Sequence, residues 1–326
     1  MRLITVTAES FPIAGTFTIS RGSKTAADVV LVEIAEGAHR GRGECMPYDR
    51  YGESVAKSIT EIESLRASLE AGLGRKELQG SMKACAARNA LDCALWDLEA
   101  KQSGRSAAAL AGLPALTSVT TAYTLSLGSV ESMAAAAKAN AHRPLLKLKL
   151  AGPGDLERVA AVHANAPNSR LIVDANEGWT ATIFTELAPK LVPLGVEMIE
   201  QPLPASDDSA LAGLSRPIAV CADESCHGVE TLPQLVGKYD AVNIKLDKTG
   251  GLTGALALAD AAAAQGFAIM IGCMVATSLS MAPAMLVAQR ARWVDLDGPL
   301  LLARDRENGL QFQGSLLQPP TPALWG

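Results

Sequence analysis

The feature that most constrains the fold of this chain is a regular alternation of short β-rich runs and Ala/Leu-rich amphipathic stretches after Thr117. Eight runs recur about every 25 residues and read TSVTTAYTL, LLKLKL, LIVDAN, VEMIEQP, IAVCADES, AVNIKLD, AIMIGCM and WVDLDGP. Strands that alternate with helices form a parallel sheet with right-handed crossovers. Eight such units predict a closed β/α barrel. The alternative is an open doubly wound sheet, but no G-x-G-x-x-G follows the first strand.

The first third of the 326-residue chain has strands before helices, which predicts an α+β unit. Strand patterns cover residues 3–6, 17–20 and 29–34, with 29–34 paired to 2–7, then a Gly-rich connection at 37–43 and helices at 54–69 and 84–101. Gly104 is expected to end the last helix. We therefore predict an α+β capping domain at 1–115, a modified (β/α)7β barrel at 116–300, and a C-terminal segment at 301–326 that returns to the capping domain.

Composition limits the partners. The net charge is −5, the pI is near 5.5, and no basic run forms a patch, so we expect neither a nucleic-acid nor a membrane partner. The first residues alternate like a strand and unlike a signal peptide, and no apolar run is long enough to span a bilayer. We expect a cytoplasmic protein, and the sequence leaves open whether it forms a homo-oligomer.

The six cysteines are scattered through a chain large enough to need no disulfides, which predicts reduced and mostly buried thiols. Cys221, Cys226 and His227 could suggest a zinc site. However, no second pair of ligands follows at the usual spacing, so a zinc site is the weaker interpretation.

Charged residues interrupt the predicted strands in one shared phase. Lys149, Asp174, Glu200, Asp223 and Lys245 each lie near the carboxyl end of one strand, 25, 26, 23 and 22 residues apart. The same phase continues to Cys273 and Asp297. Such positions face one mouth of a β/α barrel, where the active sites of this fold lie. Because a buried charge must be paired or hydrated, packing alone does not explain the pattern.

Three carboxylates from neighbouring strands, with no His or Cys among them, offer the all-oxygen site that a hard cation prefers. We therefore predict that Asp174, Glu200 and Asp223 bind one Mg²⁺. A single carboxylate of this kind would be better explained by a bond to a loop backbone or to a lysine.

The lysines indicate proton transfer. Lys147 and Lys149 point to the same face of their strand because the side-chain period is two. Neighbouring positive charges lower a lysine pKa, so that the side chain can act as a base near neutral pH. Lys245 is expected across the mouth, and Lys248 in the following loop. A base on each side of a metal suggests proton removal from one face of a carbon and return to the other.

These motifs together resemble the enolase superfamily. K-L-K at 147–149, D-A-N at 174–176, E-Q-P at 200–202, D-E-S at 223–225 and N-I-K-L-D-K-T-G-G at 243–251 are similar to its muconate lactonizing enzyme subgroup. The similarity extends to the GECMPYDRYGES loop and the ARNALDCALWDL helix near the amino terminus. Within the subgroup, D-L-D at 295–297 resembles the dipeptide epimerases.

The resemblance implies a Mg²⁺-dependent isomerase that interconverts L-Ala-D-Glu and L-Ala-L-Glu, with a small-molecule dipeptide as substrate and a role in recycling cell-wall peptides. Lys149 and Lys245 would be its two acid/base residues, and Lys147 would tune Lys149 and touch the substrate carboxylate. Asp295 and Asp297 would bind the α-ammonium group. Arg21 would bind a side-chain carboxylate, and Thr124 and Cys273 would be further substrate contacts.

Other activities compete with this one. Muconate cycloisomerase and o-succinylbenzoate synthase act on substrates without an ammonium group, so D-L-D would have no evident function; N-acylamino acid racemase is a third alternative. A metal-dependent barrel hydrolase commonly uses His ligands, and the four histidines here are all out of phase with the strand ends. A catalytically silent binding protein is expected to have lost at least one of the lysines or carboxylates.

Overall fold

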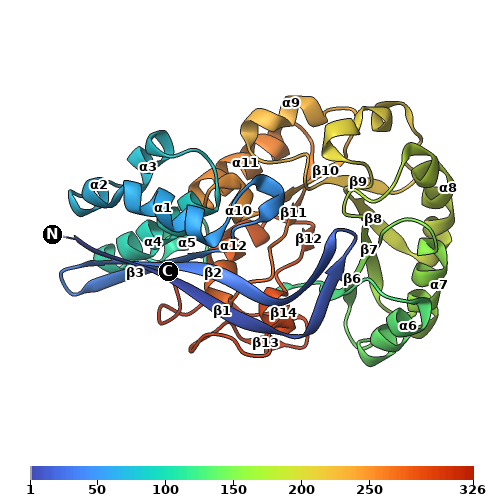
Figure 1. Cartoon of the computed structure of the whole chain (residues 1–326), viewed down its shortest axis with the longest axis horizontal. Coiled ribbons are helices and arrows are strands. Elements are labelled where there is room, and N and C mark those ends of the chain that lie inside the picture. Colours follow the sequence, from blue (N-terminus) through green and yellow to red (C-terminus); the bar gives the residue numbers. More distant parts are fainter. Residues whose placement is uncertain (1) are drawn as a thin grey trace.

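The computed structural model describes residues 2–326, which form a barrel with a separate antiparallel sheet beside it (Figure 1). The barrel sheet has eight parallel strands in sequence order. They are β5 Tyr123–Leu125, β6 Leu145–Lys149, β7 Arg170–Asp174, β8 Val196–Glu200, β9 Ala219–Ala222, β10 Ala241–Ile244, β11 Ala268–Ile271 and β12 Trp293–Val294.

The sheet curls until its first and last strands meet, where the Ala122 N–H donates a 2.7 Å hydrogen bond to the Val294 carbonyl. One residue from each strand, or from the position beside it, packs into a common buried cluster inside the sheet. The members are Ala122, Leu145, Ile172, Met198, Cys221, Ala241, Met270 and Trp293. This ring of side chains confirms the predicted barrel over the open sheet. It also explains Cys221, which is part of the barrel core.

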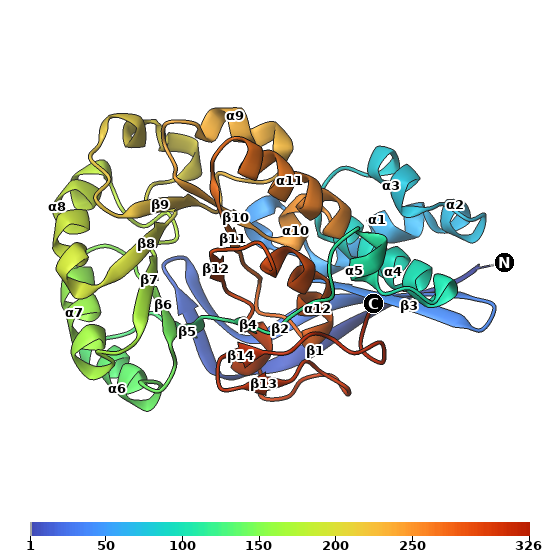
Figure 2. The ribbon, with the colours of Figure 1, turned by 180° about the vertical axis from the view of Figure 1, so that it is seen from behind.

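Helices cover the outside of the barrel (Figure 2). They are α6 Val130–Ala139, α7 Asp155–Asn165, α8 Ala181–Leu191, α9 Leu232–Leu235, α11 Leu252–Ala264 and α12 Ser278–Ala288. The one-turn helix α10 Leu246–Thr249 instead follows β10 at the barrel mouth. An amphipathic helix after every strand was expected, and this is wrong after β8. Only the 3-10 turns η3 Ala205–Asp207 and η4 Ser209–Gly213 lie there, in a connection with Pro202 and Pro204 at one end and Pro217 at the other, which disfavour a longer helix.

The amino-terminal sheet has the order β1–β2–β3, with β1 Arg2–Ile19, β2 Gly22–Glu36 and β3 His39–Cys45. The predicted pairing of 29–34 with the first strand is confirmed, with Ile34 opposite Ile4. The first two predicted strands are one long strand, and its hairpin with β2 extends from the sheet to the barrel mouth (Figure 1). Helices α1 Val55–Ser64, α2 Arg66–Glu70, α3 Arg75–Ser81, α4 Ala86–Ser103 and α5 Ala107–Leu110 follow.

The predicted Gly-rich connection at 37–43 is wrong, because most of it is strand β3. A Cβ on Gly41 would lie 2.1 Å from the Ala94 carbonyl oxygen, and one on Gly43 would lie 2.1 Å from that of Ala90. These glycines therefore allow α4 to pack directly on the strand. The helix itself ends as predicted, with Gly104 in the left-handed conformation at φ 67°.

The carboxyl terminus lies against the amino-terminal unit. A small sheet joins β4 Val119–Thr120 to β13 Phe312–Gln313 and β14 Leu316–Leu317. Farther on, Trp325 Nε1 donates to the Cys93 carbonyl at 3.0 Å, and the Gly326 N–H donates to Asp97 at 2.7 Å. Within residues 2–326, none of the helices has the length and apolar character needed to cross a membrane.

Asp247 is buried between the amino-terminal unit and the barrel. Its Oδ1 accepts hydrogen bonds from the Met46 N–H at 3.2 Å and from Asn89 Nδ2 at 2.7 Å. Desolvation by burial raises the pKa of Asp247 to about 7. An unfolded carboxyl group titrates near 4, so the folded chain holds this proton over a pH range in which the unfolded chain has released it. The contribution of Asp247 to stability therefore falls as the pH rises toward 7.

Asp247→Asn keeps the accepting oxygen and removes the titration. We expect the variant to gain stability relative to the unmodified chain by on the order of 2 kcal/mol between pH 5 and pH 8. Urea unfolding of both proteins at the two pH values measures this difference. An exposed change, Asp207→Asn, is the control. A difference in the free energy of unfolding between the unmodified chain and Asp247→Asn that does not vary with pH would contradict the expectation.

Candidate active site

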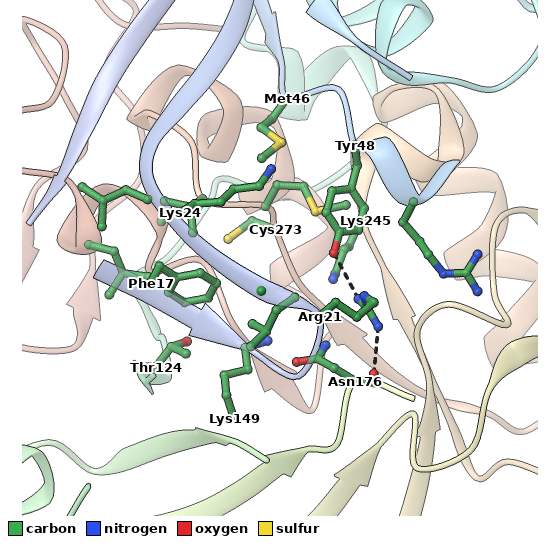
Figure 3. Close-up of a pocket in the computed structure, with 18 of the residues that line it drawn as sticks. Phe17, Arg21, Lys24, Met46, Tyr48, Thr124, Lys149, Asn176, Lys245 and Cys273 are labelled. Carbon is green, nitrogen blue, oxygen red and sulfur yellow. Dashed lines mark hydrogen bonds between the residues drawn. The ribbon is translucent and has the colours of Figure 1, made fainter. Parts of the chain in front are cut away.

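A cavity of about 420 Å³ lies at the carboxyl ends of the barrel strands. The β1–β2 hairpin and the loop after β3 supply one wall, which includes Phe17, Arg21, Lys24, Met46 and Tyr48 (Figure 3). The barrel supplies the other wall, lined by Thr124, Lys149, Asn176, Asp223, Glu224, Lys245, Cys273, Asp295 and Asp297. Most of the residues predicted from the strand phase therefore share one cavity, between the two parts of the chain. Lys147, Asp174 and Glu200 lie deeper.

The three predicted metal ligands come together at the base of this cavity. Asp174, Glu200 and Asp223 each offer a carboxylate oxygen, and these oxygens lie within 4.8 Å of one another. All three side chains are buried. Among residues 2–326 this is the one group of three or more His, Cys, Asp or Glu side chains that could hold a metal ion, so the alternative zinc site is not formed.

The lysines surround the triad. Lys149 Nζ lies 2.6 Å from Asp174 Oδ2, and Lys245 Nζ lies 2.7 Å from Asp223 Oδ2. Lys149 is the last residue of β6, and Lys245 directly follows β10. Three strands separate β6 from β10 in the eight-stranded sheet, so the two ammonium groups approach the triad from opposite sides. Lys147 Nζ lies between Glu200 Oε2 and Asp295 Oδ2, at 2.7 Å from each.

Burial and charge act in opposite directions on these lysines. Desolvation lowers the pKa of Lys147, but Asp295, Glu200 and Asp174 raise it, and the result lies well above the usual value. The pKa of Lys245 is likewise lowered by desolvation and raised by Asp223, with the same net direction. The carboxylates of the protein therefore raise the pKa values of Lys147 and Lys245, whereas the lowered lysine pKa expected from the sequence depends on a divalent cation near the ammonium groups.

Unpaired acceptors test whether the site fits a metal. Six buried side-chain nitrogen or oxygen atoms within residues 2–326 have no hydrogen-bond partner. Five of them are oxygens at the barrel mouth, and one of these, Glu200 Oε2, forms an ion pair with the Lys147 ammonium group at 2.7 Å. The other four lie on Asn176, Glu224, Asn243 and Asp295. Buried acceptors without donors are costly, and a cation or a cationic ligand would satisfy them. The all-oxygen donor set therefore fits a hard divalent ion such as Mg²⁺.

The carboxylates of D-L-D lie at the side of the cavity formed by the last strand. Asp295 accepts from Lys147, and its other oxygen is unpaired. Asp297 accepts the Thr124 N–H at 2.6 Å. Burial, together with the neighbouring Asp295, raises the pKa of Asp297 to about 7. A bound cation at this place would favour the ionised form. Cys273 lines the cavity, and burial raises the pKa of its thiol well above the usual value.

Arg21 reaches the cavity, but its guanidinium group is already engaged. Its Nη2 donates to Glu224 Oε1 at 2.7 Å and to the Tyr48 hydroxyl at 3.1 Å. Its Nη1 donates to the Asn176 carbonyl at 2.8 Å and to Glu177 Oε2 at 3.1 Å. Lys24 also lines the cavity and forms no ion pair with any of residues 2–326. Its Nζ lies 5.4 Å from the centre of the Tyr48 ring (Figure 3).

Sequence reasoning placed Lys248 in the loop, which is wrong. It lies in α10, and its buried Nζ donates to Asp223 Oδ1 at 2.6 Å and to the Asn243 carbonyl at 3.0 Å. Asn243 was missed: its Nδ2 donates to Glu200 Oε1 at 2.6 Å. Its position two residues before Lys245 on the same strand is the signal that could have placed it inside the barrel. Lys24 and Glu224 had no comparable signal.

Carboxylates that can hold a cation, with ammonium groups on both sides and a separate domain over the cavity, are typical of a class of capped barrel enzymes that depend on a metal. Two family models match the chain: "Mandelate racemase / muconate lactonizing enzyme, N-terminal domain" over residues 1–112, and "Enolase C-terminal domain-like" over residues 129–322. The chain belongs to the mandelate racemase/muconate lactonizing enzyme group of the enolase superfamily.

Individual relatives are more specific. The chain is 48% identical to the L-Ala-D/L-Glu epimerase of Escherichia coli (strain K12) over 314 residues, which cover 96% of this chain and 98% of that protein. It is 46% identical to an N-acetyl-D-glutamate racemase of Pseudoalteromonas sp over 300 residues, 91% and 95% of the two chains. A crystal structure of an Agrobacterium tumefaciens enolase family member, described as homologous to dipeptide epimerases and holding sodium and L-Ala-L-Glu, matches with 52% identity, full coverage of both chains and a TM-score of 0.98.

Proposed function

We propose that this protein is a Mg²⁺-dependent dipeptide epimerase that interconverts L-Ala-D-Glu and L-Ala-L-Glu. The observation that carries the proposal is the placement of Lys149 and Lys245 on opposite sides of the carboxylate triad, with Asp295 and Asp297 within the same cavity. The relatives support it: their names include dipeptide epimerases, and solved members hold magnesium or sodium together with a dipeptide.

The chemistry follows from the acidity of the substrate. An α-proton beside a carboxylate is very weakly acidic, and its removal leaves a dianionic enediolate. Mg²⁺ bound by Asp174, Glu200 and Asp223 would neutralise part of that charge. One of Lys149 and Lys245 removes the proton from one face of the carbon, and the other returns a proton to the opposite face. Lys147, between the triad and Asp295, adds a positive charge where the enediolate forms.

Recognition of the two ends of the dipeptide uses opposite charges. Asp295 and Asp297 would bind the α-ammonium group of the first residue, and the unpaired oxygen of Asp295 is the acceptor available for it. The side-chain carboxylate of the second residue needs a cation. The sequence assigned that role to Arg21, but four hydrogen bonds already occupy its guanidinium group. The contacts favour Lys24.

Lys24→Met should therefore lower kcat/KM for L-Ala-L-Glu about tenfold, because a hydrogen bond to a charged group contributes about 1.5–3 kcal/mol and this lysine is exposed. The uncharged analogue L-Ala-L-Gln should lose little. Arg21→Met is the matched comparison and should affect both substrates alike. Steady-state kinetics with the two dipeptides decide the matter. A Glu-selective loss in Arg21→Met, with none in Lys24→Met, would return the role to Arg21.

A second candidate function is racemisation of an N-acylated glutamate, since one relative is named an N-acetyl-D-glutamate racemase. Such a substrate has no ammonium group and would leave the second oxygen of Asp295 without a donor, since Lys147 binds only the first. The experiment that separates the two is a screen for α-proton exchange in deuterated water, run on a dipeptide library and on N-acetyl amino acids. Exchange confined to the N-acetyl compounds would overturn the dipeptide proposal.

A further inference from the structure

The tip of the β1–β2 hairpin is bonded to one backbone group of the barrel, the Asn176 carbonyl. Ser20 Oγ donates to this oxygen at 2.9 Å, and Arg21 Nη1 donates to it at 2.8 Å. In Figure 3 the Arg21 side chain lies directly beside Asn176 at the edge of the cavity. Two donors from the amino-terminal unit thus converge on the loop that follows β7.

That loop has an unusual backbone. Asn176 and Glu177 have φ values of 45° and 65°, in the left-handed region that residues other than glycine seldom adopt. Consecutive residues in this conformation persist only where surrounding contacts hold them. Besides the two hairpin donors, the Glu177 N–H donates to the Gln201 carbonyl at 2.9 Å. The hairpin is therefore one of the contacts that hold this conformation.

The conformation matters because of what Asn176 does on its other side. Its N–H donates to Asp174 Oδ1 at 2.9 Å, and its Nδ2 donates to Asp174 Oδ2 at 3.1 Å. Both oxygens of this carboxylate are thus oriented by one residue. The Asn176 side chain is buried, and its Oδ1 is unpaired and faces the cavity. Partners of a ligating carboxylate fix its orientation and change metal affinity.

We propose that Ser20 and Arg21 are positioning residues for the metal ligand Asp174, acting through the carbonyl and side chain of Asn176, so that docking of the hairpin and binding of the metal support each other. This inference rests on the assignment of Asp174 as a ligand of Mg²⁺. By linkage, the metal strengthens the docking of the hairpin as much as docking strengthens metal binding.

The charge of Arg21 makes the test discriminating. Removing a positive charge near the triad should, by Coulomb's law alone, tighten the binding of a divalent cation. The positioning role predicts the opposite sign, about tenfold weaker binding in Arg21→Met. Ser20→Ala removes one donor without changing the charge and should weaken Mg²⁺ binding several-fold, whereas Ser20→Thr, which keeps the hydroxyl, should restore it.

The measurement is calorimetric titration of the full-length protein with Mg²⁺ alone, without substrate. Arg50→Met is the matched control, because Arg50 binds Glu177 through two hydrogen bonds at 2.8 and 2.9 Å but does not touch the Asn176 carbonyl. Its affinity should stay within about threefold of the unmodified protein. Unchanged or tighter binding in both Ser20→Ala and Arg21→Met would overturn the inference, as would equal weakening in Arg50→Met.

A second readout follows the backbone itself. Hydrogen exchange at residues 175–178 of the metal-free protein should accelerate in Ser20→Ala and not in Ser20→Thr, and Mg²⁺ should slow exchange at the hairpin tip. The variant Asp174→Asn distinguishes failure of the metal assignment from failure of the proposed coupling. If it leaves Mg²⁺ affinity intact, the metal assignment fails. If it abolishes binding while Ser20→Ala does not weaken it, only the coupling fails.

Discussion

Replacing Lys149 or Lys245 with methionine is expected to slow epimerisation in both directions by about 10²–10⁴-fold, because in the proposed mechanism each lysine is the acid in one direction and the base in the other. Each variant should still exchange the α-proton of one stereoisomer with deuterated solvent. The two variants should exchange opposite isomers, because the side chains approach the triad from strands on opposite sides of the barrel.

Proton NMR of each isomer in deuterated water, with each variant, measures this directly. Lys147→Met is the comparison: its ammonium group lies deeper, within 2.7 Å of Glu200 and Asp295, so its loss should slow exchange of both isomers. If the Lys149 and Lys245 variants exchange the same isomer, the two bases do not flank the carbon, and an epimerase mechanism is excluded.

Loss of the metal is expected to lower turnover by a comparable factor. Removing Mg²⁺ with a chelator should abolish turnover, and Glu200→Gln should lower it by about three orders of magnitude, since several kcal/mol of charge stabilisation is lost. The barrel should stay folded in both cases. Lysine side chains lie close to all three carboxylates, and Asn243 donates to Glu200 without the metal.

A matched control lies on the same strand. Glu197 pairs with Arg170 near the surface, and Glu197→Gln should keep both Mg²⁺ affinity and turnover. Calorimetry, circular dichroism and the epimerisation rate together separate loss of metal from loss of fold. Full activity in the chelated protein would refute the metal-assisted mechanism.

The periodic part of this molecule could be predicted from its sequence. The strand phase identified the residues of the triad and the lysines because a parallel barrel places equivalent positions at one mouth, and the structure brings them within hydrogen-bonding range. The same reasoning fails where contacts depend on chain segments far apart. From the sequence, Gly41 and Gly43 are typical of a flexible connection, but in the structure α4 packs directly against them. Lys248 has the sequence pattern of a loop residue, but in the structure it lies in the short helix α10 and binds Asp223.

The contacts of Arg21 could not be predicted from the sequence. A cation near the amino terminus is a sensible candidate for binding a substrate carboxylate, but the sequence does not show that Arg21 forms ion pairs with Glu177 and Glu224. Glu177 and Glu224 lie 156 and 203 residues away from Arg21 along the chain, and no local pattern links such positions. Lys24, three residues on, shares the hairpin and lacks a carboxylate partner within the described chain.

The long β1–β2 hairpin has a consequence for how such a protein could diversify. Its base belongs to one sheet, and its tip faces the cavity at the mouth of the barrel. With the proposed role of Lys24, one substitution there would change which side chain is accepted and would leave the barrel lysines in place. Substitutions at Ser20 and Arg21 should be tolerated less well, because both side chains donate hydrogen bonds to Asn176, which orients the carboxylate of Asp174. New substrate preferences should therefore arise by single substitutions in the β1–β2 hairpin more readily than by exchange of the whole hairpin between relatives.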